Sequence, residues 1–211
     1  MDMMCSFRKS LLRRKSDDPV VDMSSAKPLD YAADLQEFAV SEAEYLGQHA
    51  EYHVLVTGAA VFNKEGKLLL VQRAADETAF PNYWEIPGGK VDDTDESILH
   101  AAARELKEET GLEARRVVRK VDSFTFVVER AGRPATKFLK MIFEIEVDRA
   151  EGSAVVLDAI EHQQFVFASE DEVAGERVGD VQLEYISARN KAVKLEAFRL
   201  RGARGEASIA I

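Results

Sequence analysis

The chain has 211 residues, a length that fits one domain of ordinary size with tails or an additional helix. Its hydrophobic share of 46% and its charged share of 31% are typical of a soluble globular protein, and no apolar run approaches the ~18–20 residues that a membrane-spanning helix needs. The formal net charge of -10 gives no overall attraction for nucleic-acid phosphates. We therefore expect neither polymeric nucleic acid nor a membrane among its partners.

The first 30 residues mix charged side chains, serines and prolines without apolar periodicity, so we predict a flexible leader over residues 1–30. Its basic stretch at residues 8–15 fits either a solvated tail or a mitochondrial targeting segment, and we expect a cytoplasmic location. The only cysteine, Cys5, lies in this leader, which excludes an intramolecular disulfide and a cysteine-based zinc site. We predict one domain over residues 31–205 and a short tail over 206–211.

The domain is predicted to begin with a short helix within residues 31–46, where apolar side chains recur at helical spacing. Two runs rich in β-forming residues follow, at 53–62 and 67–71. The four residues from Asn63 to Gly66 lie between them and are typical of a turn. This pattern predicts a β-hairpin.

A sharp turn and a helix are predicted next. A short strand at residues 83–86 enters Pro87-Gly88-Gly89, a sequence that turns the chain and brings bare backbone close to another part of the molecule. The helix is predicted over residues 95–110, and Gly111 is suited to the left-handed conformation that ends helices.

The second half of the chain continues the mixed α and β order. Strands are predicted at 117–128 and 137–147, joined around Gly132, and at 163–167. An amphipathic helix is predicted over 181–200, with one apolar face made of Val181, Tyr185, Ala188, Ala192 and Leu195.

Three glutamates form the most informative cluster. Their spacing places Glu105, Glu108 and Glu109 within one turn of the predicted helix, where like charges repel one another unless a cation lies between them. Hard divalent cations such as Mg²⁺ prefer carboxylate oxygens. The alternative, purely structural interpretation of these glutamates is a solvated acidic face that pairs with Arg104 and Lys107.

The segment around these glutamates resembles the Nudix box, whose pattern is Gly, five residues, Glu, seven residues, then Arg-Glu-apolar-any-Glu-Glu-any-Gly-apolar. The second half matches at every position from Arg104 to Leu112. One departure is that six residues separate Gly89 from Glu96, so either Glu96 follows a one-residue insertion or Asp95 takes its place. The lead-in Trp84–Lys90 and the run Leu68–Arg73 also resemble the family, and the likeness extends over roughly residues 54–172.

The resemblance implies an α/β/α sandwich with a mixed sheet and a catalytic loop-helix-loop. It implies Mg²⁺ or Mn²⁺ bound by the Gly89 carbonyl and by the carboxylates of Glu105, Glu108 and Glu109, with Arg104 orienting these glutamates by a bidentate ion pair. The general base is either a box glutamate or an acid from outside the box, for which Glu161 is our candidate. Candidate phosphate contacts are Lys90 and Arg73, and both also fit ordinary surface residues. His100 and His162 are interpreted as structural, because an oxygen-rich site needs no imidazole.

The implied activity is hydrolysis of the diphosphate linkage in a small nucleotide-type substrate. Nucleoside triphosphates, oxidised ones included, are the first class to test, followed by nucleotide sugars, ADP-ribose and dinucleoside polyphosphates. An isomerase acting on isopentenyl diphosphate would need a cysteine inside the domain, whereas Cys5 lies in the leader. The alternative outside catalysis is a silent nucleotide sensor on the same fold. A homodimer is compatible with either function.

Overall fold

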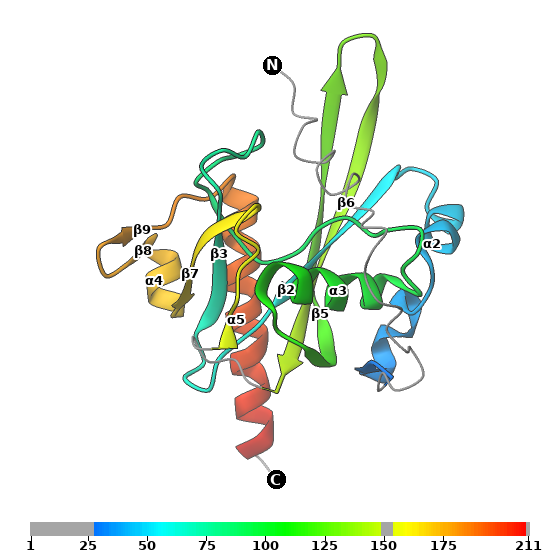
Figure 1. Ribbon diagram of the computed structural model, residues 1–211. Coiled ribbons are helices and arrows are strands. Elements are labelled where there is room, and N and C mark those ends of the chain that lie inside the picture. Colours follow the sequence, from blue (N-terminus) through cyan, green and yellow to red (C-terminus); the bar gives the residue numbers. More distant parts are fainter. Residues whose placement is uncertain (1–27, 149–153, 210–211) are drawn as a thin grey trace, which may run out of the picture.

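A computed structural model of the chain describes residues 28–148 and 154–209, and Figure 1 shows the arrangement of its elements. Most of the predicted leader therefore lies outside the described residues. Along the chain the elements are β1 (Asp30–Tyr31), the 3-10 helix η2 (Ala33–Phe38), α2 (Glu42–Gln48), β2 (Val54–Ala60), β3 (Leu68–Arg73), β4 (Trp84–Glu85), α3 (Ile98–Thr110), β5 (Ala114–Arg130), β6 (Arg133–Val147), β7 (His162–Ala168), α4 (Glu170–Ala174), β8 (Arg177–Val178), β9 (Val181–Gln182) and α5 (Ala188–Ile209).

The strands form a mixed sheet and two smaller sheets. In the four-stranded sheet the order is β1-β5-β6-β2, with β2 parallel and β5 antiparallel to β6. An antiparallel sheet has the order β4-β3-β7, and β8 pairs with β9. Because α3 contacts β2 and α5 contacts β5, helices flank the mixed sheet (Figure 1). The predicted α/β sandwich with a mixed sheet is confirmed. None of the helices in the described ranges is long and apolar enough to cross a membrane.

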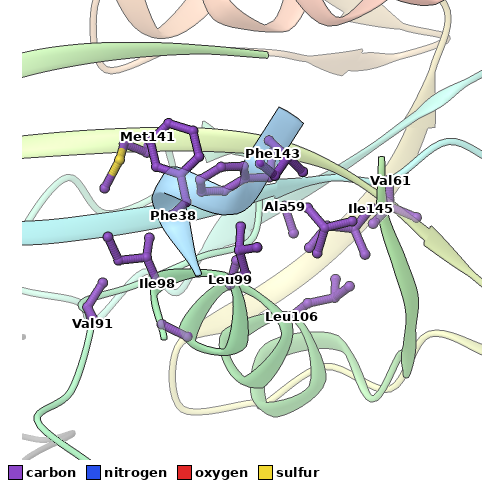
Figure 2. Packing of buried hydrophobic residues seen from close by; sticks show 14 of the residues in the cluster. Phe38, Ala59, Val61, Val91, Ile98, Leu99, Leu106, Met141, Phe143 and Ile145 are labelled. Atoms are coloured by element: carbon purple, nitrogen blue, oxygen red, sulfur yellow. The ribbon is translucent and has the colours of Figure 1, made fainter. Parts of the chain in front are cut away.

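The apolar face of α3 anchors the site-bearing helix to the core. Ile98, Leu99 and Leu106 are fully buried and pack toward Met141 and Phe143 of β6, as Figure 2 shows. Burial of each such side chain stabilises the fold by about 1.5–3 kcal/mol. The helix therefore holds the adjacent arc of its surface, which carries the glutamates, in one orientation.

Both ends of α3 are capped by side-chain or glycine geometry. The Ser97 hydroxyl accepts a hydrogen bond from the His100 amide, and Gly111 adopts a φ of 70° at the C-terminal end, as predicted. The helix begins at Ile98, so the predicted start at residue 95 is wrong. The cause is a turn in which the Asp92 amide donates to the Asp95 carboxylate and the Asp95 amide donates to the Asp92 carbonyl.

The hairpin predicted around Asn63–Gly66 is only partly correct. The turn forms, because the Asn63 amide donates to the Lys67 carbonyl at 2.9 Å and Gly66 has a φ of 75°. Beyond one isolated bridge between Phe62 and Leu68, however, β2 and β3 do not pair. β2 pairs along its whole length with β6, and β3 pairs with β7 and β4. The turn passes the chain from one sheet to the other.

Two helix predictions at the ends of the domain also need correction. Tyr31 of β1 pairs with Val117 of β5. The two helices η2 and α2 replace the single helix expected within residues 31–46. Near the C-terminus, Val181 pairs with Val178 in a short hairpin, so α5 begins only at Ala188. Its buried face differs from the predicted one and consists of Asn190, Val193, Lys194, Ala197 and Phe198.

Candidate active site

The three predicted metal ligands on α3 differ in exposure. The Glu109 residue is buried and the Glu105 side chain is only 13% exposed, whereas the Glu108 side chain is 60% exposed. Carboxylates are rarely buried without a partner, because removing a charge from water is costly. Glu105 and Glu109 are therefore the two members of the cluster whose burial requires a reason.

Bare backbone of the turn at Gly88 and Gly89 lies directly against these two acids. The Gly88 amide donates to Oε2 of Glu109 at 2.8 Å. A Cβ atom added at Gly89 would lie 2.5 Å from Oε2 of Glu105. The Gly89 carbonyl accepts from the Thr57 amide at 2.8 Å and from the Thr57 hydroxyl at 3.4 Å. The close approach predicted for this turn is confirmed, and its partner is the acid cluster.

Arg104 links the loop to the glutamates through all of its guanidinium nitrogens. Nε and Nη2 donate to the two oxygens of Asp95, each at 2.8 Å, and Nη1 donates to Glu105 at 2.9 Å and to Glu108 at 3.0 Å. Burial alone would lower the Arg104 pKa, but Asp95 and Glu105 outweigh it and raise that pKa. The arginine stays charged and restrains the Glu105 carboxylate beside Gly89.

The same contacts distinguish Asp95 from Glu96, the two candidates for the first acid of the Nudix box, which lies in the loop before α3. The Asp95 side chain is 5% exposed and makes the bidentate pair with Arg104. The Glu96 side chain is 83% exposed, and its Oε2 lies 3.5 Å from Nε2 of His100. Asp95 therefore occupies the position of the acid that supports the helix, and Glu96 points into solvent.

Glu161, the candidate from outside the box, lies beside Glu109. Ligand atoms of Glu109, Glu161 and His162 all fall within 4.8 Å of one another. The backbone holds Glu161 in place, because its carbonyl accepts from the Ala74 amide at 2.9 Å at the end of β3. His162 is buried, and its Nε2 lies 3.6 Å from Oε1 of Glu85. The sequence analysis interprets His162 as structural and does not include it in the site. Its position next to Glu161 in the chain is the signal that could have indicated its place in the cluster.

Electrostatics in this cluster favour protonation or a cation. Burial, and then repulsion from Glu105, Glu85 and Glu161, raise the pKa of Glu109 to about 8 despite attraction by His162. Burial also raises the pKa of Glu105 to about 7, although Arg104 opposes the shift. A site of crowded carboxylates and a backbone carbonyl matches the oxygen donors that Mg²⁺ and Mn²⁺ prefer. The residues present therefore fit a divalent cation.

Comparison with known proteins agrees with this geometry. A model of the NUDIX domain matches residues 52–187, more than half of the chain. The chain belongs to the Nudix family of hydrolases. A CTP pyrophosphohydrolase of Escherichia coli is 33% identical over 147 residues, which cover 69% of this chain and 93% of that protein. An m7GpppN-mRNA hydrolase of Danio rerio, NUDT17, is 41% identical over 87 residues, but the match spans only 27% of its length.

Solved structures share the Nudix fold. The MutT protein of Methanosarcina mazei Go1 has a TM-score of 0.55 at 24% identity, over 72% of this chain and 96% of that one. The NUDIX domain of Shewanella oneidensis NrtR, complexed with ADP ribose, has a TM-score of 0.53 at 20% identity, over 77% of this chain and 99% of that one. At these identities the likeness concerns the fold alone.

The two predicted phosphate contacts of this Nudix protein lie in different surroundings. Arg73 directs its donors inward, with Nη1 at 2.7 Å from Glu85, Nε at 2.8 Å from the Ala79 carbonyl and Nη2 at 3.4 Å from Glu77. Lys90 follows Gly89 and bridges to Val56, and its carbonyl accepts from Arg104. Their contact with phosphate stays a prediction.

Proposed function

We propose that this Nudix protein uses Mg²⁺ or Mn²⁺ to hydrolyse the diphosphate linkage of a small nucleotide-type substrate. The observation that carries the proposal is the convergence of the buried carboxylate of Glu109 and the largely buried carboxylate of Glu105 on the bare backbone of Gly88 and Gly89. Burial, and then repulsion from neighbouring carboxylates, raise both pKa values toward neutrality. Such a cluster is expected where a cation is bound, since a purely structural role would favour neutral or apolar side chains.

The cation would be held by Glu105, Glu108, Glu109 and the Gly89 carbonyl. A divalent cation at this place would supply positive charge against the diphosphate and would make a water molecule more acidic. Arg104 keeps the Glu105 carboxylate oriented through its pairs with Glu105 and Asp95.

Glu161 is our candidate for the general base. Burial, the largest cause, and repulsion from Asp158 and Glu77 raise its pKa, although His162 attracts the carboxylate. A pKa closer to neutrality suits a group that accepts a proton from water and later releases it. A box glutamate is the alternative base. Lys90, which follows Gly89 in the chain, and Arg73 remain our candidate phosphate contacts.

For the substrate class we place nucleoside triphosphates first, CTP among them. The support is the E. coli relative named a CTP pyrophosphohydrolase, which this chain matches over 93% of that protein's length. Nucleotide sugars, ADP-ribose and dinucleoside polyphosphates form the next classes to test. A small nucleotide is thus the expected partner.

The test is release of phosphate or pyrophosphate from a panel of these substrates, with Mg²⁺, with Mn²⁺ and with EDTA. Glu109→Gln is the site variant, and Glu113→Gln, at an exposed residue paired with Lys107, is the matched control. We expect metal-dependent cleavage by wild type and by Glu113→Gln and none by Glu109→Gln. Nucleotide binding without turnover in all three proteins would instead identify a sensor.

A further inference from the structure

A buried histidine lies beside two acids of the candidate active site, although it is not among the metal ligands proposed above. His162 is the first residue of β7 and is 1% exposed. Its ligand atom and those of Glu109 and Glu161 all lie within 4.8 Å of one another. Around one divalent cation with bonds of about 2.1 Å, donors on opposite sides lie roughly 4.2 Å apart. A cation between these three side chains therefore requires only small movements.

The ring nitrogens of His162 are not satisfied by hydrogen bonds. Nδ1 and Nε2 are both buried, and neither has a hydrogen-bond partner within the described part of the chain. Nε2 lies 3.6 Å from Oε1 of Glu85, which is beyond hydrogen-bonding distance. Buried polar atoms normally have a partner, because leaving them unsatisfied costs free energy. A ligand from outside the chain would supply the partner for this imidazole.

The surroundings of His162 match those of histidines that bind metals. Such a histidine usually directs its second ring nitrogen at a carboxylate, which fixes the orientation of the ring. Glu85 takes this position on the Nε2 side, and its Oε1 is itself held by Arg73 at 2.7 Å. The nitrogen left to bind a metal is then Nδ1.

The competing arrangement is a protonated imidazole that pairs with Glu85 and Glu109. A protonated imidazole donates at both nitrogens and has no lone pair for a metal. In a charge-assisted hydrogen bond the nitrogen and the oxygen lie about 2.7–2.9 Å apart, whereas 3.6 Å separates Nε2 of His162 from Glu85. The pair also needs no third acid, although Glu161 is present. The geometry therefore favours a metal over an ion pair.

We infer that His162 supplies an imidazole nitrogen to a divalent cation held with Glu109 and Glu161, and that this position prefers Mn²⁺, Co²⁺ or Zn²⁺ to Mg²⁺. Mg²⁺ takes oxygen ligands and keeps several waters, whereas imidazole suits first-row transition metals. The remainder of the acid cluster offers oxygen atoms alone and provides no such preference. Glu161 can bind the cation and still accept a proton, because a carboxylate has two oxygens.

The inference rests on the metal site of the proposed function, but its test needs no turnover. The full chain is saturated with Mn²⁺, and electron spin echo envelope modulation detects the nitrogen nuclei bound to the ion. The chain has four histidines, so isotopic labelling with ¹⁵N-histidine marks only their nitrogens. His162→Gln removes the imidazole but keeps a polar side chain. His100→Gln is the matched control, at a partly exposed histidine of α3.

A second variant keeps the test decisive if His162→Gln does not fold. Replacing His49, His53 and His100 together by glutamine leaves His162 as the only histidine of the chain. A histidine signal in this variant can come from His162 alone.

We expect a metal-bound histidine nitrogen in wild type, in His100→Gln and in the single-histidine chain, and none in His162→Gln. In competition experiments, the affinity of His162→Gln for Mn²⁺ and Zn²⁺ relative to Mg²⁺ should fall by at least about tenfold, a loss usual even for residues that only orient a metal ligand. Wild type without histidine coupling at saturating Mn²⁺, or coupling that survives His162→Gln, would overturn the inference.

The failure of this inference is distinguishable from the failure of the proposed function. Histidine coupling in a chain that hydrolyses no substrate of the panel would refute the hydrolysis alone. Metal-dependent hydrolysis without histidine coupling would refute the role of His162 alone.

Discussion

Replacing Gly89 by alanine tests the metal site through one methyl group. The added Cβ would lie 2.5 Å from Oε2, 2.6 Å from Cδ and 2.7 Å from Oε1 of Glu105, while ordinary contact begins at 3.4 Å. The carboxylate must therefore retreat by about 1 Å, and a displacement of that size can lower the rate on the order of 10²-fold. We expect turnover and Mg²⁺ affinity to fall together.

The stability of this variant should change little, because the obstructing atoms are the end of a side chain and not backbone. Gly88→Ala is the contrasting variant: Gly88 has a φ of 150°, and its Cβ would lie 2.3 Å from the Thr57 carbonyl oxygen. We expect thermal unfolding to show a large loss for Gly88→Ala and almost none for Gly89→Ala, and steady-state kinetics to show the loss of turnover. A Gly89→Ala protein with wild-type turnover and metal affinity would refute the placement of Glu105 at the metal.

Three further predictions concern the charges around α3. Asp95→Asn should lower both turnover and the free energy of unfolding, the latter by about 1.5–3 kcal/mol, because a charged pair with Arg104 is lost. Glu96→Gln should leave turnover and the free energy of unfolding unchanged in the same kinetic and chemical-denaturation assays. Equal losses in Asp95→Asn and Glu96→Gln would contradict the assignment of Asp95 as the partner of Arg104. The Kd for Mg²⁺, measured by calorimetry, should decrease as the pH rises through the pKa values of Glu105, about 7, and Glu109, about 8. The reason is that the cation needs both carboxylates ionised. A Kd that does not change with pH would count against these two ligands. Without metal, the free energy of unfolding should fall between about pH 4.5 and about pH 8, because over this range the folded chain retains protons on Glu105 and Glu109 that unfolded glutamates lose near 4.5.

The sequence contained enough information to predict the acid cluster because the cluster is local. Glu105, Glu108 and Glu109 belong to one helix whose apolar period is unambiguous, and the glycines that meet Glu105 and Glu109 lie on the loop before that helix. The choice between Asp95 and Glu96 needed coordinates, since a turn closed by hydrogen bonds between Asp92 and Asp95 decides which acid faces Arg104.

The incorrect predictions share a different cause, which is that pairing partners are not local. The turn at Asn63–Gly66 forms as expected, but β2 and β3 find other partners in separate sheets. Val181 and Tyr185 match a helical period by coincidence, whereas the Glu184 carbonyl accepts from the Trp84 amide and holds this stretch extended.

The burial of two lysines, Lys140 and Lys194, could not be predicted from the sequence for a related reason. A lysine in a strand or an amphipathic helix is normally solvated, so Lys140 and Lys194 carry no local mark of burial. Only the docking of α5 against the mixed sheet brings the two ammonium groups and Asn190 together.

The most direct test of the central claim is a Mg²⁺ titration of CTP hydrolysis by wild type and by Glu109→Gln. Glutamine can still accept from the Gly88 amide and introduces no buried charge, so the variant should unfold at a temperature equal to or above that of wild type. We predict saturable, Mg²⁺-dependent turnover in wild type and a loss of several orders of magnitude in the folded variant. Turnover that persists in Glu109→Gln, or that persists in wild type after EDTA treatment, would contradict a metal site at these glutamates.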